Sequence, residues 1–271
     1  MLRKFKILGH PLRFCLTTPV MNSASLELGL DLSFETVDLP PEDLPNVMAT
    51  LKAGELAGVI TTMPFKTPSI AFLDDSSSEV KEINAVNLIL NEDGNLYGHN
   101  TDWIGAVGAL KTVMPNLEGK KILILGAGGA ARAATYGFKK EGATITLWNR
   151  TPEKAQECAK RMGVNWIEDL NELKEKPEVI VNATAVSNFD RQKTLIPFAL
   201  WENVEVAMDA VYGKTSLFLE EAKATRVKNI ISGELWFLKQ VFTIFEIITG
   251  KKAPEDFMTR LTNDAKEIAK N

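Results

Sequence analysis

A glycine-rich turn between a predicted strand and a predicted helix is the strongest chemical signal in the chain. Gly126, Gly128 and Ala131 follow the apolar run at residues 122–125 with the spacing G-x-G-x-x-A. The first glycine permits the tight bend, the second lets the backbone approach a pyrophosphate, and the alanine allows close helix packing. Glycines can serve a turn alone, but the strand before them and the helix after them favour dinucleotide binding. The predicted contacts are Gly126, Ala127, Gly128, Gly129 and Ala130.

The residues after the next apolar run indicate which dinucleotide is bound. In an NAD site, an acidic residue at the end of the second strand accepts a hydrogen bond from the ribose 2′-hydroxyl. Here the run at residues 145–148 is followed by Asn149, Arg150 and Thr151 and then by Lys154, so cations replace the acid. Arg150 can pair with a 2′-phosphate through two hydrogen bonds, and Lys154 adds a positive charge. We therefore predict NADP as the cofactor, although ordinary surface cations near a helix start give the same pattern.

Hydride transfer to a ketone requires a proton donor for the developing alkoxide, and a Lys or Tyr supported by a carboxylate can supply it. Candidates are Lys66, Asp102 and Tyr212. Lys66 follows a predicted buried strand at residues 58–62, where open α/β sheets present residues to a ligand crevice. Asp102 precedes an apolar helical pattern that begins at Trp103, a position that a helix N-cap also explains.

The histidines and cysteines form no recognisable metal or hydrolase pattern. His10 and His99 each stand in a predicted loop without a second ligand or a nucleophile at a suitable spacing. The two cysteines, Cys15 and Cys158, are too far apart in sequence for a metal knuckle. We therefore predict no metal site, and two thiols in a chain of this size fit a reducing compartment.

Composition and charge narrow the range of partners. The net charge of -4 and the spread of the lysines provide no basic surface for nucleic acid or an anionic membrane. Residues 1–12 contain no apolar run long enough for a signal peptide, and charged residues interrupt the apolar stretch at 235–248. We expect a cytoplasmic protein, monomer or homodimer, that binds a small-molecule substrate and neither nucleic acid nor membrane.

Apolar runs alternate with helical patterns along the chain, which predicts an α/β fold. A length of 271 residues favours two lobes, since domains of about 100 to 200 residues are usual. The first series of predicted strands covers residues 5–9, 33–37, 58–62 and 84–90, with a helix at 43–52. The second series, at 122–125, 145–148, 179–181 and 204–208, has the doubly wound pattern. Two helices, at 235–249 and 254–270, end the chain.

Short motifs follow one another in order over nearly the whole sequence. They are Gly9-x-Pro11-Leu12, Thr62-x-Pro64-Phe65-Lys66, Asn84-Ala85-Val86-Asn87, Gly98-x-Asn100-Thr101-Asp102, Gly126-Ala127-Gly128-Gly129-Ala130, Asn149-Arg150-Thr151, Asn182-Ala183-Thr184, Asp209-Ala210-Val211-Tyr212, and Gly233 with Gln240. Together they resemble the shikimate and quinate dehydrogenase family. The resemblance implies an α/β substrate-binding lobe at residues 1–102, a Rossmann NADP-binding lobe at 103–234, and C-terminal helices at 235–271 that complete the first lobe.

The resemblance also implies an activity and the residues that perform it. The family interconverts a ring ketone and an alcohol on a small cyclic carboxylate with NADP, so 3-dehydroshikimate and shikimate are the expected pair, held in a cleft between the lobes. Lys66 and Asp102 would be the catalytic pair, and Gly233 would join the cofactor site. The implied substrate contacts are Thr17, which would meet the carboxylate, and Thr62, Asn87, Tyr212 and Gln240.

Several positions depart from the family pattern. The replacements are Cys15-Leu16-Thr17 for Ser-x-Ser, Met21 for His, Ile60 for Asn, Leu88 for Thr, Ala185-Val186-Ser187 for a Pro-x-Gly stretch, and Trp236 for a Met that meets the nicotinamide. A site that hydrogen-bonds substrate hydroxyls gains about 10⁴-fold discrimination from them. Losing such partners leaves quinate or another less polar cyclic substrate as an alternative to shikimate.

Two other functional classes remain open at this point. The same polar losses are compatible with a relative that binds NADP without catalysis. Another two-lobed NADP enzyme that uses a lysine as acid, such as a methylene-folate dehydrogenase, shares the overall pattern. The Asn-Thr-Asp motif at residues 100–102 resembles that last class less.

Overall fold

The computed structural model describes residues 2–12, 15–184, 196–212, 216–252 and 254–268. The chain forms two compact units, one of Met1–Thr101 with Val241–Asn271 and the other of Asp102–Gln240, called unit 1 and unit 2 below. The sequence predicts boundaries after residue 102 and before residue 235. In the structure the chain returns to unit 1 between Gln240 and Val241, inside a long helix. The roles expected of the two domains stay predictions.

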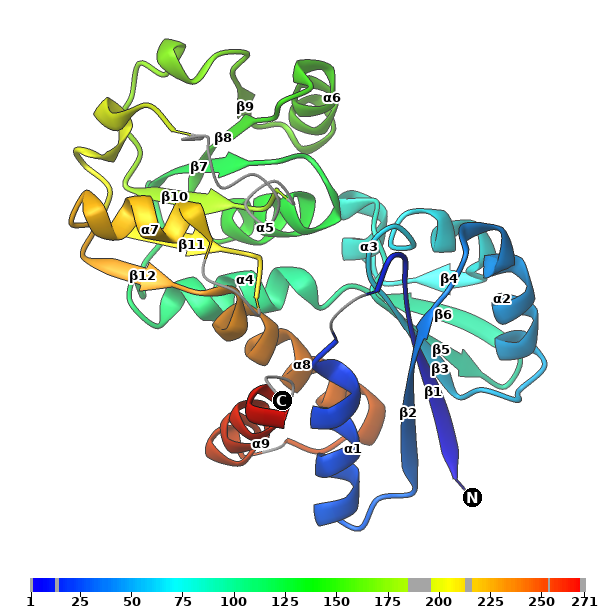
Figure 1. The fold of residues 1–271 in the computed structure, drawn as a ribbon. Coiled ribbons are helices and arrows are strands. Elements are labelled where there is room, and N and C mark those ends of the chain that lie inside the picture. The colour runs from blue at the N-terminus through cyan, green and yellow to red at the C-terminus, as the bar shows by residue number, and fades with distance from the viewer. Residues whose placement is uncertain (1, 13–14, 185–195, 213–215, 253, 269–271) are drawn as a thin grey trace. The chain divides into compact units, whose positions relative to one another are not determined.

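Unit 1 is built on a mixed β-sheet (Figure 1). Its described strands are β1 (Arg3–Gly9), β2 (Leu32–Asp38), β3 (Gly58–Thr61), β4 (Asp75–Ser76), β5 (Leu88–Glu92) and β6 (Asn95–His99), in the order β2-β1-β3-β5-β6-β4. Strand β1 pairs in parallel with β2 and β3, whereas β5 is antiparallel to β3 and β6. All four residues of β3 are buried, as in a strand covered on both faces. The end of β3 is therefore a rigid point of the unit.

Helices from both ends of the chain complete unit 1. They are α1 (Thr17–Glu27), α2 (Leu44–Lys52), α3 (Ser78–Ile83) and the C-terminal α9 (Glu255–Ile268). Helix α9 lies beside α1 (Figure 1), and the guanidinium of Arg260 donates to the Glu27 carboxylate at 2.7 Å. The C-terminal segment therefore packs on the N-terminal part of the same unit.

The strand predicted at residues 84–90 begins later than expected. Asn84 has a left-handed backbone, with φ of 55°, and ends helix α3, so β5 starts only at Leu88. Asn tolerates this conformation because its short polar side chain can bond locally. Ala85 and Val86 are fully buried without being in a strand. Their burial explains why an apolar run here was mistaken for strand.

Unit 2 contains a second sheet, and all of its described pairings are parallel. The strands are β7 (Lys121–Leu125), β8 (Thr144–Trp148), β9 (Asn165–Trp166), β10 (Val179–Asn182), β11 (Val206–Asp209) and β12 (Asn229–Ile231), in the order β12-β11-β10-β7-β8-β9. This is the strand order of the Rossmann fold, in which the order reverses between the first and fourth strands, here β7 and β10. The predicted fold class is confirmed.

Helices cover the two faces of the unit 2 sheet. They are α4 (Asp102–Lys111), α5 (Gly129–Lys140), α6 (Pro152–Met162), α7 (Leu217–Ala224) and α8 (Gly233–Thr249), the last of which begins earlier than predicted and continues into unit 1. No helix in the described ranges combines the length and the apolar character that a membrane crossing requires.

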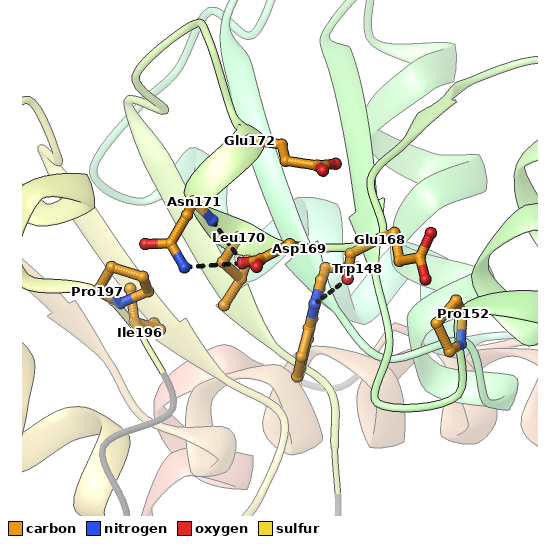
Figure 2. A pocket seen from close by; sticks show the side chains of 9 residues that line it. All are labelled: Trp148, Pro152, Glu168, Asp169, Leu170, Asn171, Glu172, Ile196 and Pro197. Atoms are coloured by element: carbon orange, nitrogen blue, oxygen red, sulfur yellow. Dashed lines mark hydrogen bonds between the residues drawn. The ribbon is translucent and has the colours of Figure 1, made fainter.

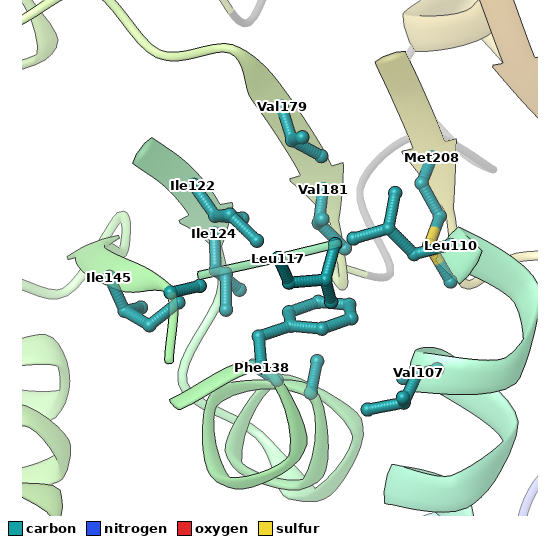
Figure 3. Close-up of a cluster of buried hydrophobic side chains, with 14 of the residues drawn as sticks. Val107, Leu110, Leu117, Ile122, Ile124, Phe138, Ile145, Val179, Val181 and Met208 are labelled. Carbon is teal, nitrogen blue, oxygen red and sulfur yellow. The ribbon is translucent and has the colours of Figure 1, made fainter. Parts of the chain in front are cut away.

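The core of unit 2 follows from the alternation of side chains along its strands. On β7, Ile122 and Ile124 face a cluster that contains Phe138 of α5 (Figure 3). Leu123 and Leu125, which alternate with them, belong to a second cluster on the other side of the sheet. Each fully buried side chain of this kind contributes roughly 1.5 to 3 kcal/mol. The sheet is therefore held on both faces, and its loops project from a rigid base.

Candidate active site

The backbone around Lys66 is fixed by two neighbouring segments of unit 1. The N–H of Thr62 donates to the carbonyl of Leu8 at 2.8 Å, and the N–H of Phe65 donates to the carbonyl of Thr62 at 2.7 Å. The carbonyl of Lys66 accepts from the N–H of Val86 at 2.8 Å. Strand β1 and residues 85–87 thus hold the tight turn that follows β3, and this turn presents Thr62 and Lys66.

Asn87 ties this region to the segment that leads into Asp102. The side chain of Asn87 is fully buried, its Nδ2 donates to Thr101 Oγ1 at 2.8 Å, and its Oδ1 accepts from the Thr101 N–H at 2.8 Å. Nearby, Asn100 Nδ2 donates to the carbonyl of Ala85 at 2.8 Å. The Asn-Thr-Asp motif is therefore anchored through its first two residues.

The positions that depart from the family pattern lie in different environments. Met21, Ile60 and Leu88 are 1%, 4% and 0% exposed and belong to the packed core of unit 1. Thr17, the first residue of α1, is also buried, while Cys15 is half-buried. The apolar replacements therefore fill space inside the unit. The replacement at residues 185–187 lies outside the described residues.

The glycine-rich turn of unit 2 has the geometry that a phosphate cradle requires. Gly126 adopts a φ of +119°, and a Cβ added there would lie 2.8 Å from the carbonyl oxygen of Ala183. Only glycine fits such a position. Gly128 precedes α5, and a Cβ added there would meet nothing within 4 Å, so the backbone is open to a ligand beside the helix N-terminus. The residues present fit a dinucleotide pyrophosphate.

The segment after β8 presents two cations at the start of α6. Asn149 Nδ2 donates to the carbonyl of Thr151 at 2.9 Å, and Thr151 is the N-cap of α6. Arg150 and Lys154 are exposed. In the described part of the chain neither forms an ion pair with a carboxylate. Both charges are therefore available to an anion, which fits a 2′-phosphate.

Unit 2 contains a hollow of about 890 Å³ (Figure 2). Its lining residues are Trp148, Pro152, Glu168, Asp169, Leu170, Asn171, Glu172, Ile196 and Pro197. Trp148 Nε1 donates to the carbonyl of Glu168 at 3.1 Å, and Asn171 Nδ2 donates to Asp169 Oδ1 at 2.8 Å. Trp148 and Pro152 flank residues 149–151 on either side, so the hollow adjoins the predicted 2′-phosphate site.

A buried carboxylate joins the ends of β10 and β11. Asp209 is fully buried, and its Oδ1 accepts from Asn182 Nδ2 and from the Val211 N–H, both at 3.0 Å. Its Oδ2 accepts from Ser216 Oγ. Burial raises the pKa of the Asp209 carboxyl to about 6 despite these donors. The network holds the backbone that leads to Tyr212. No sequence pattern indicates this role of Asp209, because the residue simply follows an apolar run.

Helix α8 connects three residues predicted for the site. The ring of Phe237 lies 5.1 Å from the ring of Tyr212, and Trp236 Nε1 donates to the backbone carbonyl of Asp102 at 2.9 Å. A Cβ added at Gly105 of α4 would lie 2.9 Å from the Gln240 Cβ. Residues 233–240, the part of α8 in unit 2, thus contact Asp102 and Tyr212 and carry Gln240. The contacts of Trp236 and Phe237 were missed because no local pattern indicates them.

Gly233 begins α8 against the same loop. A Cβ added at Gly233 would lie 2.2 Å from the carbonyl oxygen of Val211, so a side chain there would displace the backbone that precedes Tyr212. Of the other predicted residues, Thr17, Thr62, Lys66 and Asn87 lie in unit 1, and the cofactor residues lie in unit 2.

The remaining titratable candidates do not add a second site. His10 Nδ1 lies 2.9 Å from Asp38 Oδ1 near the surface, and His99 is half-buried against Tyr97. Burial raises the pKa of the Cys158 thiol to about 11, so it is protonated at neutral pH. Within the described ranges, no three His, Cys, Asp or Glu side chains gather as metal ligands.

Known proteins match both units. Residues 7–89 match the model of the shikimate dehydrogenase substrate binding domain, and residues 109–197 match that of shikimate / quinate 5-dehydrogenase. Shikimate dehydrogenase (NADP(+)) of Aquifex aeolicus is 35% identical over 260 residues, which are 96% of each chain. The chain belongs to the shikimate dehydrogenase family. The enzyme of the same name from Thermococcus kodakarensis is 37% identical over 94% of each chain.

Solved structures of the shikimate dehydrogenase family share the fold. The crystal structure of shikimate 5-dehydrogenase from Thermus thermophilus in complex with NADP(H) and shikimate has a TM-score of 0.88 at 34% identity, and the match covers 98% of this chain and 100% of that one. The predicted family and the predicted class, an NADP-dependent oxidoreductase, are confirmed. The roles of the individual residues stay predictions.

Proposed function

We propose that this chain is an NADP-dependent shikimate dehydrogenase that interconverts 3-dehydroshikimate and shikimate. The observation that carries the proposal is the glycine cradle of unit 2, where Gly126 admits no side chain, followed by the exposed cations Arg150 and Lys154, which form no ion pair with the described residues. The relatives named as shikimate dehydrogenases match nearly the whole chain and support the choice of substrate.

In this proposal, unit 2 is the cofactor-binding domain. The backbone of Gly126, Ala127, Gly128, Gly129 and Ala130 holds the pyrophosphate at the N-terminus of α5. Arg150 and Lys154 hold the 2′-phosphate, with Asn149 and Thr151 shaping the turn, and Gly233 keeps the start of α8 clear of a side chain. When bound, NADPH supplies the hydride.

The hollow beside Trp148 is suited to the adenosine end of the cofactor. The adenine is attached to the ribose that carries the 2′-phosphate. If Arg150 binds that phosphate, the adenine must lie close to Arg150, separated from it by only the ribose and its phosphate. Glu168, Asp169 and Glu172 line the hollow and would repel a phosphate, but a carboxylate accepts from an amino group. We therefore expect the base to occupy the hollow and the phosphates to lie outside it.

Unit 1 would supply the acid and part of the substrate contacts. Lys66, held in the turn after β3, donates a proton to the carbonyl oxygen of the ketone and takes it back in the reverse direction. Asp102 would provide the carboxylate that supports this proton transfer. Thr17 would bind the substrate carboxylate, and Thr62, Asn87, Tyr212 and Gln240 would contact its hydroxyl or ketone oxygens.

The core replacements favour a second candidate substrate class. Met21, Ile60 and Leu88 are buried apolar residues at positions where the family pattern described above has polar ones. A less polar cyclic carboxylate is therefore one alternative substrate, and quinate is the alternative that the family resemblance supplies. A relative that binds NADP without turnover is the alternative function. A cytoplasmic location and a monomeric or homodimeric state complete the proposal.

Turnover by the purified protein tests the proposal. NADPH oxidation with 3-dehydroshikimate is measured beside NADP⁺ reduction with shikimate and with quinate, and Lys66→Ala is the matched inactive control. Efficient turnover with shikimate that Lys66→Ala abolishes supports the proposal. Turnover with quinate alone moves the assignment to the alternative substrate, and tight NADPH binding without turnover of any of the three compounds contradicts it.

A further inference from the structure

A tryptophan occupies the α8 position at which the family resemblance expects a methionine. Trp236 is 4% exposed and lies in the first turn of α8, three residues after Gly233. Its indole N–H donates to the backbone carbonyl oxygen of Asp102 at 2.9 Å, and this bond is buried. A methionine thioether has no N–H and could not make the same bond.

The carbonyl that Trp236 engages is the first of helix α4. In an α-helix this oxygen accepts from the N–H four residues later, and its second lone pair can accept another donor. The indole therefore adds a bond from α8 to the residue whose side chain is the predicted catalytic carboxylate. Asp102 is 2% exposed, so the bond is shielded from competing water.

The same tryptophan packs directly on the next turn of α4. A Cβ added at Gly105 would lie 2.8 Å from the carbonyl oxygen of Trp236 and 2.9 Å from its Cδ1. The absence of a side chain at Gly105 thus allows α4 and α8 to approach at the level of the indole. The adjacent Phe237 contacts Tyr212 on the other side.

We infer that Trp236 is a positioning residue, which fixes Asp102 at the start of α4 through its indole N–H and so sets the rate of the chemical step. The inference rests on the proposed function, since it assigns Trp236 an effect on the dehydrogenase reaction. Trp236 acts through Asp102, so removing its N–H lowers kcat when the Asp102 carboxylate is present and has little effect when it is absent.

A double-mutant cycle tests this coupling. Trp236→Phe removes the N–H and keeps an aromatic ring, and it is compared in the wild-type and Asp102→Asn backgrounds. We expect kcat to fall about tenfold in the wild-type background, the typical worth of one hydrogen bond. In the Asp102→Asn background the same substitution should change kcat by less than about twofold. KM for shikimate should stay within about twofold, because the residues predicted to bind the substrate are untouched.

Trp201→Phe is the matched control. Trp201 is another buried tryptophan of unit 2, 5% exposed, and its indole makes no hydrogen bond to the described residues. Amide hydrogen exchange adds a readout that needs no activity. Trp236→Phe should speed exchange in the first turn of α4 by about tenfold, the worth of one hydrogen bond, and Trp201→Phe should leave it unchanged.

The outcomes separate this inference from the proposed function. An equal loss of kcat in both backgrounds, or unchanged exchange in α4, overturns the inference while the wild-type protein still turns over shikimate. An inactive wild-type protein overturns the proposed function and, with it, the catalytic effect assigned to Trp236.

Discussion

Two alanine substitutions in the glycine-rich turn should separate folding from cofactor binding. Gly128 has a φ of −76° and open space around a new Cβ, so Gly128→Ala costs the fold about 1 kcal/mol or less. The added methyl group stands where a phosphate would approach, and losing one charge-assisted hydrogen bond there costs about 1.5 to 3 kcal/mol. We therefore expect the Kd for NADPH to rise roughly 10- to 100-fold.

Gly126→Ala should instead act on the fold. A φ of +119° is unfavourable for alanine, and the new Cβ would lie 2.8 Å from the carbonyl oxygen of Ala183. Backbone strain of this kind costs about 1 to 3 kcal/mol. Because a chain of this size loses roughly 2 to 4 °C of Tm per kcal/mol, the melting temperature should fall by several degrees.

The assay combines thermal unfolding by circular dichroism with NADPH titration by fluorescence for the two variants and the wild-type protein. Wild-type affinity in Gly128→Ala would refute the idea that the pyrophosphate lies against that glycine. A wild-type Tm in Gly126→Ala would refute the steric argument for the cradle.

Three further predictions concern charged residues. Arg150→Ala should raise KM for NADPH about tenfold or more and leave KM for NADH unchanged, and equal effects on the two cofactors in steady-state kinetics would contradict the 2′-phosphate role. Asp102→Asn should lower kcat about 100-fold or more with KM for NADPH nearly constant, so an unchanged kcat would exclude a catalytic role. For Asp209, burial raises the pKa from 3.8 to about 6. As pH rises, the unfolded chain therefore loses this proton before the folded chain does. The free energy of unfolding should fall between these two pH values, by about 3 kcal/mol in total. Asp209→Asn should remove this fall. Urea unfolding of both proteins from pH 4 to 7 measures it, and if the free energy of unfolding depends on pH in the same way in both proteins, Asp209 is not the cause.

The sequence was sufficient for features that depend on local patterns. The turn at Gly126 and Gly128 predicted the strand, the helix and the parallel sheet around them, because only glycine fits the backbone geometry that such a turn needs. The start of β5 was wrong because Ala85 and Val86 are buried in a loop, and burial alone does not distinguish a loop from a strand.

Contacts between distant parts of the chain were beyond the reach of the sequence. The bond between Trp236 and Asp102 joins residues 134 positions apart, and no periodicity or motif spacing encodes it. The buried carboxylate of Asp209 likewise acts through Asn182, on a strand that is adjacent only after the sheet has formed. Such partners depend on tertiary packing, which local patterns do not determine.

The altered positions of unit 1 and the tryptophan of unit 2 point to different consequences for the enzyme. Met21, Ile60 and Leu88 are at most 4% exposed, so we expect them to affect substrate choice only through the shape and polarity of the surrounding core. Trp236 instead adds a hydrogen bond to the backbone of a predicted catalytic residue. Substitutions at the first group should therefore change the ratio of shikimate to quinate turnover, whereas substitution of Trp236 should lower kcat for both substrates by the same factor. A change of substrate ratio in Trp236→Phe would show that this tryptophan shapes the substrate pocket and does not act only through Asp102.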